Sequence, residues 1–314
     1  MMRFLGAALT VALLLLPSLP AAAAEKLTVL LDWFVNPDHG PLYVALEKGY
    51  FREAGLEVEL IAPADPNDPP RLVAAGKGDI AISYQPQLHL QAEAGLPLAR
   101  FGTLVATPLT TLIVRGDGPV QTIADLKGRK VGFSVGGFED AILGTMLATH
   151  GLSLTDVILV NVNFALSPAL MSGQVDATIG GYRNFELNQM AIEKIPARAW
   201  YPEEEGVPAY DELIFVAAKD RLSDPRLVRF LDAVERGTLF LVNHPDAAWE
   251  LFIKGRPDLD TELNRRAWTD TVPRFAHSPA ALDARRYERF ATFLKYKGLI
   301  TMVPPLESYA VQLR

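Results

Sequence analysis

The chain has 314 residues, with 30 Lys and Arg against 37 Asp and Glu and a formal net charge of −7. This acidic balance argues against a nucleic-acid partner, and the length exceeds that of a common single domain, which favours two lobes. No residue is a cysteine, which excludes both disulfides and a lipid anchor on a lipobox cysteine.

The first 24 residues have the pattern of a secretory signal peptide. Arg3 supplies the positive start, residues 5–16 form an apolar run, and residues 21–24 are four alanines ahead of Glu25. The run is shorter than the ~20 residues of a membrane span, so cleavage is favoured over a membrane anchor. We expect a mature chain that lies in the periplasm without a lipid anchor.

The mature chain opens with a strand–helix–strand order. Residues 27–31 form an apolar run of strand formers, residues 32–40 form a polar loop, and Pro41 suits the first turn of a helix. Residues 56–61 alternate as a half-buried strand does. This order recurs along the chain, and it predicts an α/β fold with mixed, mostly parallel sheets.

A weak internal repeat indicates that two lobes share one plan. Residues 72–82 and 170–179 both read as the end of a helix, a glycine stop, an aspartate and a buried strand. The alternative is that any helix-to-strand corner has this form. Two apolar stretches, residues 110–115 and 212–218, suit crossover strands that join the lobes. We expect a signal peptide over 1–24, lobe one over 25–110 plus 217–314, and lobe two over 111–216.

Two candidate ligand loops belong to lobe one, since ligands of open α/β sheets lie beyond the carboxyl ends of strands. In residues 32–39, Trp33 offers a stacking face and Asn36 a donor and an acceptor. Trp33 could instead be a core aromatic, and His39 a helix-entry residue that bonds the backbone. Tyr84 follows the strand at 80–82 and presents a ring and a hydroxyl, unless this segment is only a surface turn.

Two further candidate loops belong to lobe two. Gly136, Gly137 and Phe138 precede a helix whose first turn already holds acids, which favours a polar, uncharged ligand group over an anion. The glycine spacing matches neither a Walker loop nor a Rossmann fingerprint, and a purely structural turn is the alternative. In residues 180–187, the carboxylate of Glu186 would suit two adjacent N–H groups of an aminopyrimidine. Glu186 could instead be solvated or pair with Arg183.

Motifs for catalysis are scarce. The chain has five histidines but neither HExxH nor G-x-S-x-G, and no clustered metal-ligand spacing. His39 with Asp32 or Asp38 has the chemistry for acid–base work, but nothing in the sequence supplies a nucleophile beside it. These patterns favour a binding protein without a cofactor over an enzyme.

The loops, taken together, carry a family resemblance. Residues 32–45, with later segments at 76–79, 83–86, 136–139 and 182–187, resemble the thiamine-pyrimidine-precursor binding proteins. That family also contains the fungal thiamine pyrimidine synthases. The resemblance covers about residues 27–220; its Lys-Gly-Tyr-Phe and Gly-x-x-Asp pieces are generic to a wider group that takes up sulfonates, taurine and nitrate.

The resemblance implies a type II periplasmic binding fold and the role of a solute-binding protein of an ABC importer. The implied ligand is an aminopyrimidine such as N-formyl-4-amino-5-aminomethyl-2-methylpyrimidine, and the implied partner is a permease in the inner membrane. The protein itself is expected to be a monomer. The implied ligand-binding residues are Trp33, Asn36, His39, Tyr84, Gly136, Gly137, Phe138, Tyr182, Asn184 and Glu186.

Within that set, the resemblance implies a division of roles. Trp33 and Tyr84 would flank the ring, Asn36 and Glu186 would bond its nitrogens, and Tyr182 with residues 136–138 would close from lobe two. His39 falls where the fungal synthases keep a reactive histidine. Those synthases carry a cysteine-rich iron site, which this chain lacks. The open alternatives are a binding protein for a sulfonate, a riboflavin-like compound or another aromatic, and a synthase-like enzyme that uses His39.

Overall fold

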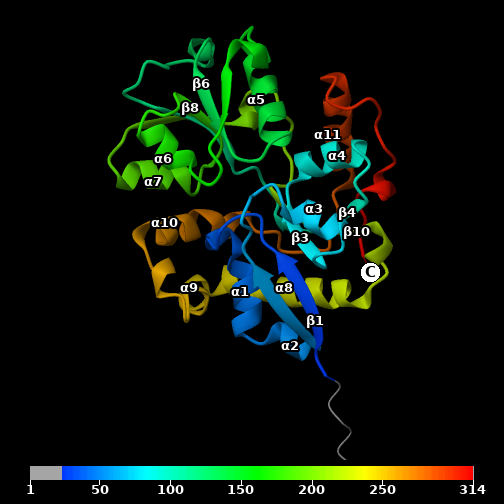
Figure 1. Ribbon diagram of the computed structural model, residues 1–314. Coiled ribbons are helices and arrows are strands. Elements are labelled where there is room, and N and C mark those ends of the chain that lie inside the picture. The colour runs from blue at the N-terminus through cyan, green and yellow to red at the C-terminus, as the bar shows by residue number, and fades with distance from the viewer. Residues whose placement is uncertain (1–22, 314) are drawn as a thin grey trace, which may run out of the picture.

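A computed structural model describes residues 23–313. The expected signal peptide therefore lies outside the described residues, except for Ala23 and Ala24. Figure 1 shows two lobes stacked on each other, with lobe two above lobe one. Within the described part of the chain, no helix has the length and apolar character needed to cross a membrane.

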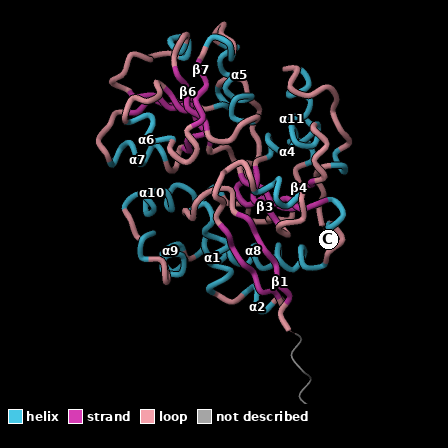
Figure 2. The backbone as a smooth tube through the Cα atoms, in the orientation of Figure 1, coloured by secondary structure: helices cyan, strands magenta, loops and turns pink. Residues whose placement is uncertain are grey.

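Each lobe is built on one five-stranded sheet, and Figure 2 shows the two sheets as separate groups of strands. The sheet of lobe one has the order β2-β1-β3-β10-β4, and that of lobe two the order β7-β6-β8-β5-β9. The strands are β1 (Glu25–Leu30), β2 (Leu56–Ile61), β3 (Ile80–Ser83), β4 (Leu98–Val105), β5 (Thr110–Arg115), β6 (Lys130–Phe133), β7 (Ile158–Asn161), β8 (Ala177–Tyr182), β9 (Ala197–Trp200) and β10 (Leu213–Ala218).

In each sheet one strand runs against the other four. β10 is antiparallel to both β3 and β4, and β5 is antiparallel to both β8 and β9, while β1, β2 and β3 are parallel, as are β6, β7 and β8. The expectation of mixed, mostly parallel sheets is therefore confirmed. The two reversed strands occupy equivalent places in the two sheet orders.

The internal repeat has a structural basis. Gly76 and Gly173 end equivalent helices with φ of 72° and 75°, a left-handed conformation that suits glycine. Asp79 then accepts the N–H of Thr28 in β1, and Asp176 accepts that of Lys130 in β6, both at 2.9 Å. Because each aspartate holds the first parallel strand of its own lobe, the two lobes do share one plan.

Helices cover both faces of each sheet, and α8 packs against α1 and α2 in lobe one. In Figure 1, α5 lies on one side of the upper sheet and α6 with α7 on the other, while α8 to α10 lie in the lower lobe and α11 stands beside α4 at the right. The helices are α1 (Gly40–Glu47), α2 (Tyr50–Glu53), α3 (Pro69–Ala74), α4 (Gln85–Glu93), α5 (Phe138–Thr149), α6 (Leu166–Met171), α7 (Glu186–Ile192), α8 (Pro225–Asn243), α9 (Pro245–Ile253), α10 (Glu262–Thr271) and α11 (Ala284–Tyr296).

The chain passes between the lobes twice, after β4 and after β9. The buried carboxylate of Glu212, just before β10, links the two passages: it accepts the N–H of Thr110 at 2.9 Å and its hydroxyl at 3.0 Å. β10 pairs along its whole length with β4, so residues 213–216, which we expected in lobe two, hydrogen-bond within the sheet of lobe one. We propose that the lobe boundaries lie at these two passages.

Candidate ligand-binding site

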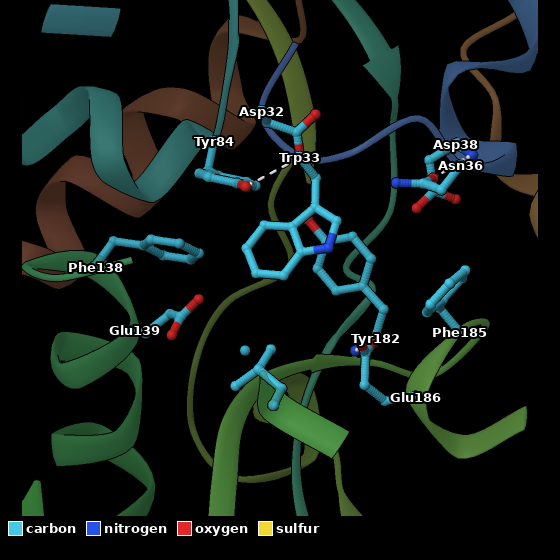
Figure 3. Close-up of a pocket in the computed structure, with 12 residues that line it drawn as sticks. Asp32, Trp33, Asn36, Asp38, Tyr84, Phe138, Glu139, Tyr182, Phe185 and Glu186 are labelled. Carbon is cyan, nitrogen blue, oxygen red and sulfur yellow. Dashed lines mark hydrogen bonds between the residues drawn. The ribbon is translucent and has the colours of Figure 1, made fainter. Parts of the chain in front are cut away.

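A cavity with an empty volume of about 410 Å³ lies between the lobes. Figure 3 shows side chains from both lobes projecting into it. The lining residues are Asp32, Trp33, Asn36, Asp38 and Tyr84 of lobe one, with Phe138, Glu139, Leu166, Gly180, Tyr182, Phe185 and Glu186 of lobe two.

The loop after β1 forms one wall of the cavity, and the side chain of Asn36 holds this loop in its conformation. The Asn36 side-chain oxygen accepts the N–H of Asp38 at 2.8 Å and so caps the short 3₁₀ helix Pro37–His39. Its amide nitrogen donates to the carbonyl of Phe34 at 3.0 Å. Both ends of the Asn36 amide are thus used to hold the loop, although its side chain also lines the cavity.

Asp32 is the centre of a small polar network in the same wall. Its Oδ1 lies 2.9 Å from Nε2 of His39, and its Oδ2 accepts the hydroxyl of Tyr84 at 3.0 Å. The other ring nitrogen of His39 accepts the N–H of Asn36 at 3.3 Å. His39 is fully buried and does not line the cavity. It therefore orients Asp32 from behind.

Aromatic rings from both lobes meet at the cavity, with Phe34 and Phe164 packed behind the rings that line it. The Tyr84 ring of lobe one stacks on Phe138 of lobe two, with centroids 4.8 Å apart and an interplanar angle of 20°. Trp33 meets Phe164 of lobe two edge to face at 4.6 Å. Phe34 and Phe185 approach each other to 5.9 Å. Flat apolar faces of this kind suit an aromatic ligand.

Glu139 brings a carboxyl group into the cavity from the first turn of α5. Its Oε2 accepts the N–H of Ser134 at 2.7 Å. Gly180, with φ of 92°, makes the room for it, since a Cβ at this position would lie 2.3 Å from Oε1 of Glu139. Burial raises the pKa of Glu139 to about 8. At neutral pH this carboxyl group mostly keeps its proton and can donate a hydrogen bond.

Glu186 brings a second carboxyl group of lobe two into the cavity, from the first turn of α7. Its Oε2 accepts the N–H of Tyr182 at 2.6 Å, and burial raises its pKa to about 7. The side chain is 8% exposed, so it is not solvated. Arg183 pairs instead with Glu203 at 2.6 Å. Both structural alternatives considered for Glu186 are therefore wrong.

Asp38 adds a fourth acid, and no lining residue is a cation. Its Oδ1 accepts Nδ2 of Asn184 at 2.7 Å and the hydroxyl of Thr271 at 2.9 Å. Burial raises the pKa of Asp38 to about 6. The lining set contains four carboxyl groups and neither Lys, Arg nor His. A sulfonate or phosphate would enter this cavity without a compensating charge, whereas N–H donors would find acceptors.

The structure brings six of the ten predicted ligand-binding residues to the cavity wall: Trp33, Asn36, Tyr84, Phe138, Tyr182 and Glu186. The other four, His39, Gly136, Gly137 and Asn184, do not line it. His39 lies behind Asp32, and Asn184 is buried against Asp38. Gly136 and Gly137 are exposed in the loop ahead of α5. Their contact with a ligand stays a prediction.

Sequence reasoning missed half of the lining set: Asp32, Asp38, Glu139, Leu166, Gly180 and Phe185. Five of these lie inside the predicted loops, so the signal was present at the level of segments. Leu166, at the start of α6, lies outside all four loops, and its apolar character resembles that of any core residue. Among residues 23–313, no group of three or more His, Asp or Glu is arranged to hold a metal ion.

Comparison with known proteins shows which family of proteins this chain is similar to. A family model described as NMT1/THI5 like matches residues 36–248. A Haemophilus influenzae protein named for thiamine biosynthesis is 52% identical over 300 residues, which cover 95% of this chain and 96% of that protein. The formylaminopyrimidine-binding protein of Halalkalibacterium halodurans is 33% identical over 77% of this chain and 74% of its own. The 4-amino-5-hydroxymethyl-2-methylpyrimidine phosphate synthase of Uromyces fabae is 29% identical over the same shares, 77% and 74%.

Solved structures show the same two-lobed fold. The alkanesulfonate-binding protein SsuA from Xanthomonas axonopodis pv. citri superposes with a TM-score of 0.71 at 17% identity, over 93% of this chain and 100% of that one. The ligand-binding component of an ABC-type import system from Staphylococcus aureus has a TM-score of 0.68 at 10% identity, over 91% and 96%. The expected periplasmic binding fold is therefore confirmed. At these identities the likeness concerns the fold alone.

Proposed function

The chain belongs to the NMT1/THI5-like family, and we propose that it binds a thiamine-related aminopyrimidine between its lobes as the solute-binding protein of an ABC importer. The observation that carries this proposal is the chemistry of the cavity wall, which combines four carboxyl groups, five aromatic rings and no cation. Such a wall matches a flat heterocycle that is rich in N–H groups.

The acids of lobe two are suited to two-point recognition of an aminopyrimidine. A carboxyl group that keeps its proton offers an O–H donor beside a carbonyl acceptor, which complements a ring nitrogen next to an amino group. Glu139, with its pKa raised to about 8, is in this state at neutral pH. Glu186, with its pKa raised to about 7, offers either an acceptor pair or the same donor and acceptor.

The rings supply the apolar part of the interaction. Trp33 and Tyr84 come from lobe one, and Phe138, Tyr182 and Phe185 come from lobe two. A planar ligand held among them contacts both lobes, so binding favours the closed arrangement over an open one. This is how a binding protein reports its loaded state without any covalent chemistry.

The wider role follows from the leader and the fold. The expected signal peptide at residues 1–24 favours export to the periplasm, where a monomer would collect ligand and deliver it to a membrane permease. The fold is shared with the ligand-binding component of an ABC-type import system. We infer that no chemistry is performed on the ligand and that no cofactor is needed.

The family includes a synthase, so an enzymatic role for His39 needs its own test. Its ring is fully buried between Asp32 and the backbone of Asn36 and does not line the cavity. This position supports orientation of Asp32 rather than transfer of ring atoms. After incubation with iron and pyridoxal phosphate, we expect an unchanged His39 by peptide mass spectrometry. A pyrimidine product together with a modified His39 would establish the synthase instead.

A thermal-shift panel tests the ligand class. N-formyl-4-amino-5-aminomethyl-2-methylpyrimidine and 4-amino-5-hydroxymethyl-2-methylpyrimidine should raise Tm, because they bind only the folded chain. Propanesulfonate, taurine, nitrate and riboflavin should leave Tm unchanged. A shift with a sulfonate and none with either pyrimidine would overturn the proposal.

A further inference from the structure

Two asparagines on opposite sides of the cavity connect the lobes. Asn184 of lobe two reaches Asp38 and Thr271 of lobe one, and we call this set the Asn184 clasp. Asn67 of lobe one reaches the loop ahead of α5 in lobe two, and we call this set the Asn67 clasp. In Figure 3, Asp38 lies on one side of the cavity, and Phe138, two residues after the end of the Asn67 clasp, lies on the other.

The Asn184 clasp uses a single amide group across the cleft. Its Nδ2 donates to Oδ1 of Asp38 at 2.7 Å and lies 2.6 Å from the hydroxyl oxygen of Thr271, at the end of α10. Asn184 is 1% exposed, and its Oδ1 has no hydrogen-bond partner within the part of the chain that the structure describes. Its side-chain hydrogen bonds therefore all run to the other lobe.

A second asparagine extends this clasp toward the surface. Nδ2 of Asn188, one turn along from Asn184, lies 2.8 Å from the carbonyl of Asn184 and 2.8 Å from Oδ2 of Asp270. Asp270 and Thr271 both belong to α10, which packs against α7 and against the 3₁₀ helix that holds Asp38. The contact is thus a polar seam between α7 of lobe two and α10 of lobe one.

The Asn67 clasp resembles one rung of a β-ladder. Oδ1 of Asn67 accepts the N–H of Gly136 at 3.0 Å, and Nδ2 donates to the carbonyl of Ser134 at 3.1 Å. Within lobe one, Oδ1 of Asp65 accepts the backbone N–H of Asn67 at 2.8 Å and its Nδ2 at 2.9 Å. Asp65 therefore fixes the orientation of the Asn67 side chain from within lobe one.

We propose that Asn184 and Asn67 are positioning residues that hold the lobes closed, and that Asn184 couples closure to the ligand through Asp38. The coupling arises because Asp38 lines the cavity while its Oδ1 is held by Asn184 and Thr271. A ligand that meets Asp38 thus meets a carboxylate that the other lobe has already oriented. This inference rests on the proposed function.

The coupling has a measurable consequence. If only the closed form binds tightly, the apparent Kd equals the intrinsic Kd divided by the closed fraction. Removing hydrogen bonds that exist only in the closed form lowers that fraction. The folding of each lobe should stay intact, because all these side-chain contacts run between the lobes except one, from Asn67 to Asp65 within lobe one. A residue with a merely structural role would lower Tm of the unliganded chain instead.

The experiment compares Asn184→Ala and Asn67→Ala with Asn243→Ala, an exposed asparagine of α8. The absence of cysteine allows a specific label pair at Thr269→Cys in lobe one and Glu193→Cys in lobe two, both exposed positions. Electron–electron double resonance then gives the interlobe distances with and without N-formyl-4-amino-5-aminomethyl-2-methylpyrimidine. Calorimetry gives Kd and Tm for the same chains.

For Asn184→Ala and Asn67→Ala we expect a smaller short-distance population and a Kd raised about tenfold, as a tenfold loss of the closed fraction requires. Tm of the unliganded chain should stay within about 2 °C of the parent, since each lobe keeps its own core. Equal short-distance populations in the parent and both variants would overturn the proposal that the two asparagines hold the lobes closed. If the parent binds no aminopyrimidine, the proposed function fails. The interlobe distances of the unliganded chains then decide by themselves whether the two clasps hold the lobes closed.

Discussion

The wall of the cavity that lobe one supplies and the wall that lobe two supplies hold their acids in different ways. In lobe one, the carboxylate of Asp32 is fixed by the side chains of His39 and Tyr84. In lobe two, Glu139 and Glu186 accept the backbone N–H groups of Ser134 and Tyr182, which lie a few residues ahead of their helices. Lobe one therefore holds Asp32 on a preorganised platform, and lobe two carries the two lining acids whose pKa values are raised furthest. Asp38 is the exception in lobe one, because Asn184 of lobe two holds it and burial raises its pKa to about 6.

This difference assigns separate tasks to the two lobes. The network around Asp32 has side-chain partners whether or not a ligand is bound, so it sets the shape of the platform. Burial raises the pKa of Glu139 to about 8 and that of Glu186 to about 7, which places both near a change of protonation at neutral pH. We expect lobe two to decide which ligand nitrogens are accepted.

The largest effect on the difference between the two walls is expected from a substitution that displaces Glu139. In Gly180→Ala the new Cβ would lie 2.3 Å from Oε1 of Glu139. We expect aminopyrimidine affinity by calorimetry to fall roughly a hundredfold, as loss of a buried, paired polar contact implies. Gly173→Ala is the control, because it has a similar positive φ of 75° but nothing within 4 Å. Equal affinity in both variants would contradict the role of Glu139.

A smaller change sharpens the role of the second acid. In Glu186→Gln an NH2 group replaces one carboxylate oxygen, and this group can donate but cannot accept a hydrogen bond. It would face either the backbone N–H of Tyr182 or the ligand. We expect Kd to rise more than tenfold, which corresponds to about 1.4 kcal/mol. Glu193→Gln, an exposed acid just beyond α7, should leave Kd unchanged. Unchanged affinity in Glu186→Gln would remove Glu186 from ligand recognition.

The platform of lobe one should tolerate a similar change better. Tyr84→Phe keeps the ring that stacks on Phe138 and removes only the hydroxyl that Asp32 accepts at 3.0 Å. Because His39 still holds Asp32, we expect Kd to rise about fivefold, equivalent to about 1 kcal/mol for one hydrogen bond. Tyr296→Phe, on an 85% exposed residue, is the control. A loss as large as that of Glu186→Gln would erase the distinction between the walls.

The acids also predict how stability depends on pH. Burial raises the folded-state pKa of Glu139 to about 8 and those of Glu186 and Glu212 to about 7, above the ordinary value of 4.5. At these three sites the folded chain therefore binds more protons than the unfolded chain between about pH 4.5 and 8, and their contribution to stability falls as pH rises through this window. Burial lowers the pKa of His89 to about 3, which opposes this trend only below about pH 6.5, so the acids dominate between pH 5 and pH 8.

Calorimetry of the unliganded chain should show Tm several degrees lower at pH 8 than at pH 5. Glu139→Gln should flatten this dependence, because the neutral amide has no proton to lose. A Tm that rises from pH 5 to pH 8 would contradict the assignment of raised pKa values to these acids.

Sequence patterns predict the frame of the molecule well. The strand at 56–61 is β2 to the residue, and Pro41 does lie in the first turn of α1. Both are read from local rules, namely alternation and proline placement. The repeat around Asp79 and Asp176 predicts two lobes of one plan because each aspartate has the same backbone task.

The site is predicted only at the level of loops. Gly180 looks like any turn glycine, and nothing local indicates that Glu139, 41 positions earlier, occupies the space its missing side chain leaves. Asn36 and Asn184 have the polar groups expected of ligand contacts, but their partners are the loop itself and the opposite lobe. Such partners are set by tertiary packing, which residue types and spacing do not encode.

The most direct test of the account is a crystal structure of the chain with N-formyl-4-amino-5-aminomethyl-2-methylpyrimidine. We expect the ring among Trp33, Tyr84 and Phe138, with its amino group and ring nitrogens within hydrogen-bond distance of Glu139 or Glu186. A pyrimidine bound outside this cavity, or one whose nitrogens meet neither acid, would contradict the central claim.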